Sequence, residues 1–169
     1  MSMSLSHLAP LALGLLCAVV CDLRRRRIPN AVAASVFLVG LGMRGFEGGI
    51  RAFLSGMAAA VLLLVVLYGP WRRGALGGGD VKLAAATGAW VGLSSLIWFS
   101  LATLIAGGVV AGFCYLLARA PARAEVRANL IIAAVHGDLP PVPSHRKGHP
   151  SVPYAVAIAA GAAFALLSR

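Results

Sequence analysis

Two aspartates, Asp22 and Asp80, stand at the edges of apolar runs, where a charged side chain is costly to desolvate. Acids are scarce in this chain, which has only 5 of them among 169 residues. A carboxylate at a membrane boundary is a functional candidate whose partner must be found. Two acids that meet cannot both ionise readily, so they share a proton. Such a pair can hydrolyse a peptide bond without a metal, because one acid activates water while the other hydrogen-bonds the carbonyl.

Asp22 is followed by four arginines, at 24–27, and then by Pro29 and Asn30. Proline suits the opening turn of a helix, because the first N–H groups of a helix have no partner within it. Asn30 is expected to cap the next helix or to line a cleft. In the alternative interpretation, Asp22 only neutralises the adjacent arginines.

Asp80 closes a run of three glycines, 77–79, and is followed two residues later by Lys82. Glycine permits backbone conformations closed to other residues and lets a substrate chain approach closely, so Gly77 and Gly79 are site candidates. Lys82 is expected either to hold the aspartate ionised and orient it, or to extend to the membrane interface. The alternative for Asp80 is a plain helix cap.

The composition indicates a membrane protein. The chain is 60% hydrophobic and 12% charged, with a mean hydropathy of +0.88, whereas a soluble chain is about one-quarter charged. The expected fold class is an all-α, polytopic bundle of membrane helices. The net charge of +10 does not indicate nucleic-acid binding, because the basic residues lie in short loops without interleaved aromatic side chains. Those loops favour anionic lipid headgroups as partners.

Six apolar runs are long enough to be membrane spans or parts of them. The expected spans are 5–21, 29–43, 52–69, 81–99, 100–118 and 152–167. The boundary between the fourth and fifth rests only on a few serines in a long apolar stretch. The first run lacks a positively charged leader region, so it is expected to be a retained span and not a cleaved signal.

The positions of the two acids follow from the number of spans between them. Two spans separate Asp22 from Asp80, and a chain that crosses a membrane twice returns to the side it left. Eleven basic residues fall in the loops on that side and three on the other. Because cytoplasmic loops carry the excess of Lys and Arg, both acids are expected at the cytoplasmic boundary, with the chain termini outside.

The polar stretch 119–150 is expected to be a cytoplasmic loop of a single membrane-embedded domain, 1–169, because it is too short for a soluble domain. Within it, His145 and His149 have the spacing of helical metal ligands. The neighbouring glycine and proline oppose a regular helix there. No metal is therefore expected.

Three segments, taken in order, resemble the signature regions of the prepilin peptidases, which are membrane aspartic peptidases of the GxGD type. They are Asp22 with RIPN at 27–30, GGGDVK at 77–82 and VPYAVAIA at 152–159. The short form of this chain is similar to the enzymes that serve Flp/Tad-type pili. The resemblance implies a multi-pass protein of the bacterial inner membrane whose active site faces the cytoplasm.

The family resemblance also implies an activity. Asp22 and Asp80 would be the catalytic pair of an endopeptidase that removes the basic leader from type IV pilin-like precursors. From their own positions, Pro153 and Tyr154 are expected to shape the start of the last helix near the site. The alternative for Tyr154 is an ordinary anchor at the membrane interface. Larger relatives carry an inserted cytoplasmic domain with paired cysteines and also methylate their product. This chain has neither that insertion nor a methyl-donor fingerprint, so methyltransferase activity and a cofactor are not expected.

A second class of function stays open at the level of sequence. The chain would then be a non-enzymatic membrane transporter or a pilus-assembly subunit, whose acids relay protons or fix helix packing. Loss of precursor cleavage on replacing either aspartate separates the peptidase from this alternative.

Overall fold

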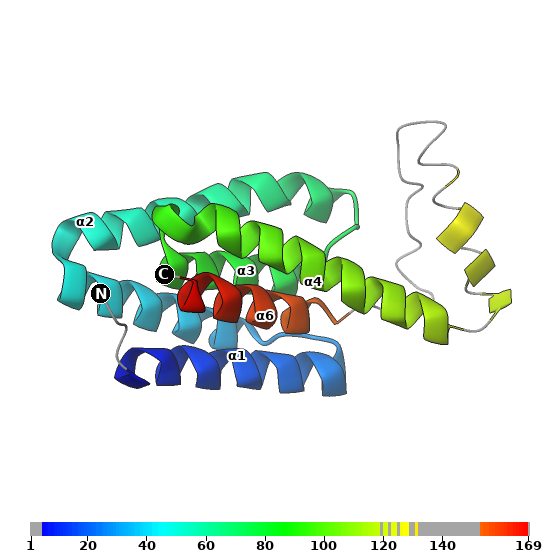
Figure 1. Ribbon diagram of the computed structural model, residues 1–169, viewed down its shortest axis with the longest axis horizontal. Helices are drawn as coiled ribbons and strands as arrows, with labels where there is room; N and C mark the ends of the chain where they lie inside the picture. The colour runs from blue at the N-terminus through cyan, green and yellow to red at the C-terminus, as the bar shows by residue number, and fades with distance from the viewer. Residues whose placement is uncertain are drawn as a thin grey trace.

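The computed structural model describes residues 5–118, 120–121, 123–124, 126–128, 131 and 153–168. Regular structure in this part of the chain is helical throughout, which confirms the expected all-α class. The elements are α1 (Leu5–Arg25), α2 (Asn30–Arg72), α3 (Gly78–Val91), the short 3₁₀ helix η1 (Leu93–Ser95), α4 (Leu96–Leu117) and α6 (Tyr154–Leu167). Figure 1 shows the longer helices packed side by side as a bundle.

The long helix α2 doubles back on itself at Gly49. That residue has φ 63° and ψ −162°, a conformation that side chains with a Cβ disfavour. Figure 1 shows the chain reversing at this point, so α2 consists of two limbs that lie one above the other in this view. The limbs correspond to the expected runs 29–43 and 52–69. Pro29 directly precedes α2 in an extended conformation, with φ −61° and ψ 137°.

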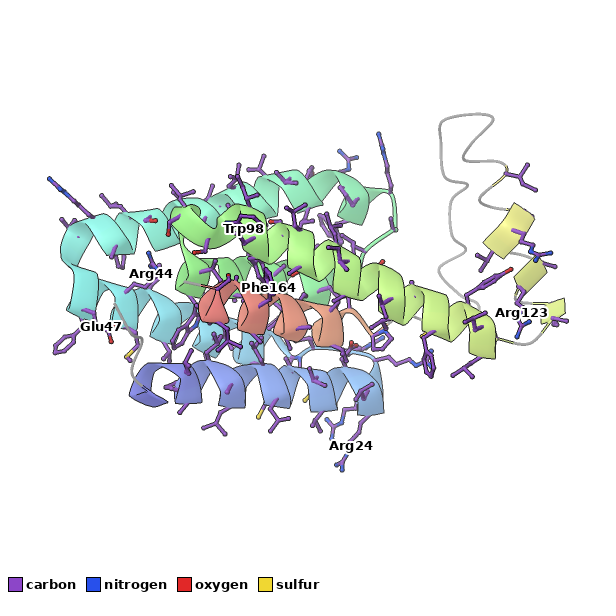
Figure 2. All side chains as sticks on the ribbon, in the orientation of Figure 1. Arg24, Arg44, Glu47, Trp98, Arg123 and Phe164 are labelled. Atoms are coloured by element: carbon purple, nitrogen blue, oxygen red, sulfur yellow. The ribbon has the colours of Figure 1, made fainter. Side chains whose placement is uncertain are left out.

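The bundle has two distinct ends. At one end, α1 stops, the second limb of α2 stops, and α3 and α6 begin. This end carries Arg24, Arg25, Arg72 and Arg73, and we call it the basic end. Gly49 lies at the opposite, far end. Figure 2 shows Arg24 at the basic end, whereas Arg44 and Glu47 lie near the reversal of α2.

Helix α3 is the innermost element and carries Asp80 in its first turn. Ten of its residues are buried: Val81, Leu83, Ala84, Ala85, Ala86, Thr87, Gly88, Ala89, Trp90 and Val91. A helix that is apolar all round is a core helix, and its small side chains let the neighbouring backbones approach closely. Asp80 is therefore attached to the most firmly packed segment of the bundle.

The outer surface of the bundle is strongly apolar. Large hydrophobic side chains are exposed on several helices, for example Leu38 at 67%, Ile97 at 71%, Leu104 at 71% and Val109 at 68%. An exposed apolar surface of this extent is typical of a protein in contact with a membrane or a partner. Two helical stretches, Asn30–Arg72 and Leu93–Leu117, have the length and hydropathy required to cross a membrane.

The expected boundary between runs 81–99 and 100–118 is wrong, because the chain turns at Gly92–Ser95. Gly92 takes a positive φ of 69°, and the Leu93 N–H donates to Ser55 Oγ at 3.0 Å. Arg44 caps the end of α3 by donating to the Trp90 carbonyl at 2.9 Å. The serine at position 100, which suggested the boundary, bonds within α4. The deciding contacts come from α2, so the local sequence does not reveal them.

The expected cytoplasmic loop 119–150 lies largely outside the described residues. Those described between 120 and 131 are helical. Arg123 donates from Nε to the Ala118 carbonyl at 2.8 Å, and Arg127 donates to the Tyr115 hydroxyl at 2.9 Å. These bonds hold two arginines against the end of α4, where they complement the negative end of the helix dipole. His145 and His149 are outside the described residues.

Gly40→Ala is expected to lower the stability of the bundle by roughly 1–3 kcal/mol, the cost of inserting a methyl group into a packed core. A Cβ on Gly40 would lie 2.5 Å from Trp90 Nε1. The indole cannot move away freely, because it is 3% exposed and donates to the Val36 carbonyl at 2.7 Å. Thermal unfolding in detergent measures the effect. Gly42→Ala is the matched control, since its Cβ would meet nothing within 4 Å, and equal unfolding temperatures would contradict the assigned contact.

Candidate active site

Asp22 lies in the last turn of α1, where the chain begins to turn back. The Arg26 N–H donates to the Asp22 carbonyl at 2.8 Å, and Arg26 itself has a φ of 49°. A left-handed conformation is unfavourable for a residue with a Cβ, so it persists only where the surroundings enforce it. The Asp22 side chain accepts a hydrogen bond from the Ala155 N–H, at 3.4 Å from Oδ2. Asp22 thus holds the first turn of α6, which is remote in the sequence.

Asp80 is held by the glycine run that precedes it. Gly77 is the N-cap of α3, with φ −70° and ψ 141°, and the Asp80 carboxylate accepts a hydrogen bond from the Gly77 backbone N–H. This is the return bond of a capping box, made from the third helical residue to the N-cap. The carboxylate lies directly over Gly77, because a Cβ there would be 2.7 Å from Asp80 Oδ2. Asp80 therefore lies in the first turn of α3, and the N-cap is Gly77, so the expectation that Asp80 itself caps the helix is wrong. The bond to Gly77 still fixes the carboxylate.

Gly79 lets the first turn of α3 approach the segment that links α1 to α2. A Cβ on Gly79 would lie 3.1 Å from the Cβ of Ile28, which is closer than side chains normally pack. Ile28 is itself buried. This contact joins the segment after Asp22 to the helix that carries Asp80. Gly79 is therefore a packing position beside the site.

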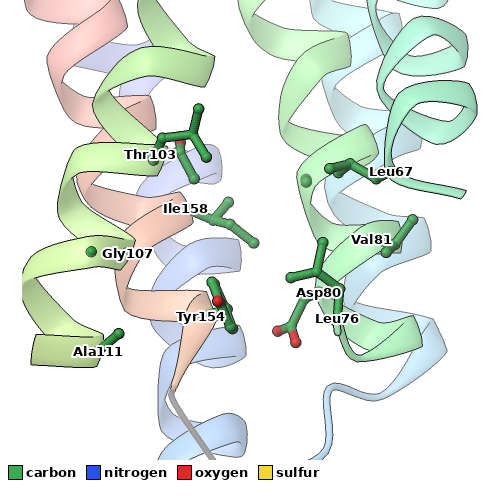
Figure 3. Close-up of a pocket in the computed structure, with 12 residues that line it drawn as sticks. Leu67, Leu76, Asp80, Val81, Thr103, Gly107, Ala111, Tyr154 and Ile158 are labelled. Carbon is green, nitrogen blue, oxygen red and sulfur yellow. The ribbon is translucent and has the colours of Figure 1, made fainter. Parts of the chain in front are cut away.

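Tyr154 and Ala155, at the start of α6, connect the two acids. Ala155 donates to Asp22, and Tyr154 lines a cavity together with Asp80 and Ile158. Figure 3 shows Tyr154 and Asp80 on opposite walls of that cavity. Pro153, the residue before Tyr154, lines a second pocket with Asp22. Segments that are far apart in the sequence therefore meet at the basic end of the bundle.

The two carboxyl groups interact electrostatically. Asp80 stands in the first turn of α3, ahead of the apolar run that begins at Val81. Burial there, and secondly the nearby charge of Asp22, raise the pKa of Asp80 to about 6, against the lowering effect of the Gly77 hydrogen bond. Desolvation disfavours the charged form of a carboxyl group, and so does a like charge close by. Asp80 is thus suited to keep its proton beside Asp22.

Lys82 and Asn30 form a pair on a different face. Lys82 Nζ donates to Asn30 Oδ1 at 2.9 Å, joining α3 to the start of α2. Both residues line a separate pocket with Ala33 and Ala85. The hydrogen-bond partner of Lys82 is therefore Asn30 and not Asp80. This bond links α3 to α2. The N-cap of α2 is Pro29, and no side chain caps this helix, so the expectation that Asn30 caps it is wrong.

Three contributors to the site were not anticipated from the sequence. The Ala155 N–H is a backbone donor, so no side chain marks it. Ile28 contributes only its close packing against Gly79, and Arg26 only its unusual backbone conformation. Their positions relative to the motifs could have indicated them. Arg26 directly precedes RIPN, Ile28 lies within it, and Ala155 lies within VPYAVAIA.

The fold and the site define a helical bundle with a coupled pair of acids at one end. The model of the type IV leader peptidase family matches residues 9–112, and the chain belongs to this family of prepilin peptidases. The match contains Asp22, Asp80 and the glycine run. No match was found among curated proteins or among solved structures. The family is that of a peptidase embedded in a membrane, in keeping with the two long apolar helices.

Proposed function

We propose that this chain is an aspartic endopeptidase that removes the basic leader of pilin-like precursors, of the Flp type, at the cytoplasmic face of the bacterial inner membrane. The observation that carries the proposal is the electrostatic interaction of Asp22 with Asp80, with both acids beside the start of α6. Burial, and secondly the charge of Asp22, raises the pKa of Asp80, and both acids lie next to residues 153–155. Family membership supports the reaction class, since this is a family of leader peptidases.

In the proposed mechanism, Asp80 carries the shared proton and Asp22 acts as the base. Asp22 takes a proton from a water molecule whose oxygen attacks the scissile carbonyl carbon, and Asp80 protonates the carbonyl oxygen. The resulting gem-diol collapses as Asp80 regains its proton and Asp22 delivers its own to the leaving nitrogen. The C–N bond breaks, and both acids return to their starting states. The reaction consumes one water and needs no cofactor.

The membrane arrangement in this proposal uses each long element as a crossing: α1, both limbs of α2, α3 from Val81 onward, α4 and α6. Asp80 then stands at the membrane boundary, outside the crossing segments. Helices α3 and α6 have 14 residues each and are thus about 21 Å long, shorter than the hydrocarbon core. They are the inner helices, with ten and seven buried residues respectively. The neighbouring helices therefore surround their ends and separate them from lipid. Because the basic end carries the arginines, the positive-inside rule places it in the cytoplasm.

The proposal is tested by incubating the purified protein, in vesicles, with a precursor that has a basic leader ahead of an apolar helix. A shorter product is expected, and its N-terminal sequence should begin at the boundary between leader and helix. A precursor that stays intact with well-folded protein would exclude this function. Transport or assembly activity without cleavage would then favour the non-enzymatic alternative.

Gly77→Ala is expected to reduce kcat by about tenfold to a hundredfold, because misplacing a catalytic group by about 1 Å costs this much. The φ of −70° at Gly77 suits alanine, so the backbone is not strained. The added methyl group would instead displace the Asp80 carboxylate, whose Oδ2 would lie 2.7 Å away. Initial cleavage rates measure the loss. Gly69→Ala, which meets nothing within 4 Å, is the control, and equal rates in the two variants would contradict the assigned position of Asp80.

A further inference from the structure

The cavity beside Asp80 continues along α4 as an apolar groove. It has a volume of about 190 Å³, and its lining includes Asp80, Ala84, Leu104, Gly108 and Tyr154. Figure 3 shows α4 and α6 on one wall and α3 with part of α2 on the other. Asp80 therefore stands at the basic end of a groove whose walls are otherwise mostly apolar.

Helix α4, which forms one wall of the groove, packs closely against α6. A Cβ on Gly161 of α6 would lie 2.9 Å from the Thr103 backbone nitrogen and 3.0 Å from the Phe99 carbonyl oxygen. These backbones thus approach each other as closely as glycine allows. On the side of α4 that faces the groove, a Cβ on Gly108 would meet nothing within 4 Å. Leu104, one turn earlier, is 71% exposed.

We infer that this groove, which we call the α3–α4 groove, docks the apolar helix of the precursor, so that the peptide bond ahead of that helix reaches Asp80. The inference rests on the proposed function and adds the place and direction of substrate binding. Three observations favour this occupant. The groove ends at Asp80, its walls are apolar, and Gly108 leaves room for a helix backbone to approach. Small residues permit such close contact between helices within a membrane.

The direction of the substrate follows from the two ends of the groove. The apolar segment lies along α4, away from the basic end, and the scissile bond lies at Asp80. The leader then leaves the groove on the side of the second pocket, which is lined by Asp22 and Arg26. The peptide must be extended at Asp80, because a carbonyl inside a helix is already hydrogen-bonded.

Gly108→Leu tests the groove by filling it. Two precursors are compared: one with its complete apolar helix, and one truncated a few residues after the cleavage site. For each protein we take the ratio of two kcat/KM values, that of the complete precursor over that of the truncated one. In the variant this ratio is expected to fall about tenfold to a hundredfold, which corresponds to about 1.4–2.7 kcal/mol of lost binding. Gly112→Leu is the control, because a Cβ there also meets nothing within 4 Å and Gly112 does not line the groove. An unchanged ratio in Gly108→Leu would overturn the inference.

A crosslinking measurement separates docking from catalysis. In an Asp80→Asn background in which Cys17, Cys21 and Cys114 are replaced by alanine, Gly108→Cys should form a disulfide with a cysteine in the precursor helix. Gly112→Cys should form little. Equal crosslinking at the two positions, as expected if lipid or a second copy of this chain fills the groove, would overturn the inference. Failure of the wild-type protein to cleave either precursor, together with crosslinking at 108, would instead reject the proposed function and retain the docking groove.

Discussion

Asp22→Asn and Asp80→Asn are each expected to reduce precursor cleavage by about 10²–10⁴-fold or more, the range contributed by a positioned acid or base. Asparagine keeps the size of the side chain but neither accepts a proton from water nor supplies one to a carbonyl oxygen. Because the two acids act as one unit, the double variant should be hardly slower than either single variant. Initial cleavage rates in vesicles measure all three.

Two controls separate lost chemistry from lost structure. Thermal unfolding should be nearly unchanged in both variants, since an asparagine oxygen still accepts the hydrogen bonds from Ala155 and Gly77. Glu47→Gln removes an acid near the reversal of α2, at the far end of the bundle, and should cleave normally. Full activity in either aspartate variant would rule out the acid pair.

The second large effect is expected with pH. Burial, and then the charge of Asp22, raise the pKa of Asp80 to about 6. In the proposed mechanism Asp80 must carry a proton, which it holds below this pH and loses as the pH rises through it. The value of kcat/KM should therefore fall above about pH 6, by roughly tenfold for each further pH unit, because this parameter reports the ionisation of the free enzyme.

One form of the pH profile would contradict the assigned role of Asp80. An alkaline decline that begins only above pH 8 would show that the proton needed for catalysis is not on a group with the pKa of Asp80. The decline must also be reversible, which separates titration from unfolding at high pH. Returning the protein from pH 8 to pH 6 before the assay should restore the full rate.

The sequence was informative about the positions of the acids, because simple rules govern them. A chain that makes two passes between Asp22 and Asp80 returns both to the same end, and the reversal at Gly49 produces those passes. The glycine run before Asp80 also indicated that a helix starts near this residue, although α3 begins at Gly78 and not after Asp80. These features depend on local patterns, namely apolar runs and the conformational freedom of glycine.

The details that were missed depend on contacts between distant segments. The end of α3 at Val91 is set by Arg44, which lies in α2 and donates to the Trp90 carbonyl. The boundary expected at Ser100 was therefore false. Lys82 lies only two residues from Asp80, but successive residues of a helix point in different directions. It therefore reaches Asn30 on another face.

The contact of Asp22 with α6 is the clearest example of what local patterns cannot provide. The donor is the backbone N–H of Ala155, a residue with an inert side chain. The first N–H groups of any helix are unpaired and attract a carboxylate. Which carboxylate arrives there depends on how α1 and α6 pack, and that is a property of the whole bundle.

The pairing of Asp22 with Asp80 is tested most directly by measuring whether cysteines at these two positions can be crosslinked in the folded protein. Asp22→Cys and Asp80→Cys would be combined in a chain whose natural cysteines, Cys17, Cys21 and Cys114, are replaced by alanine, and treated in vesicles with a short bifunctional thiol reagent. We expect an efficient crosslink within one chain, and none when Asp22→Cys is paired with Glu47→Cys. Absence of the 22–80 crosslink, or equal crosslinking in both pairs, would contradict the pairing.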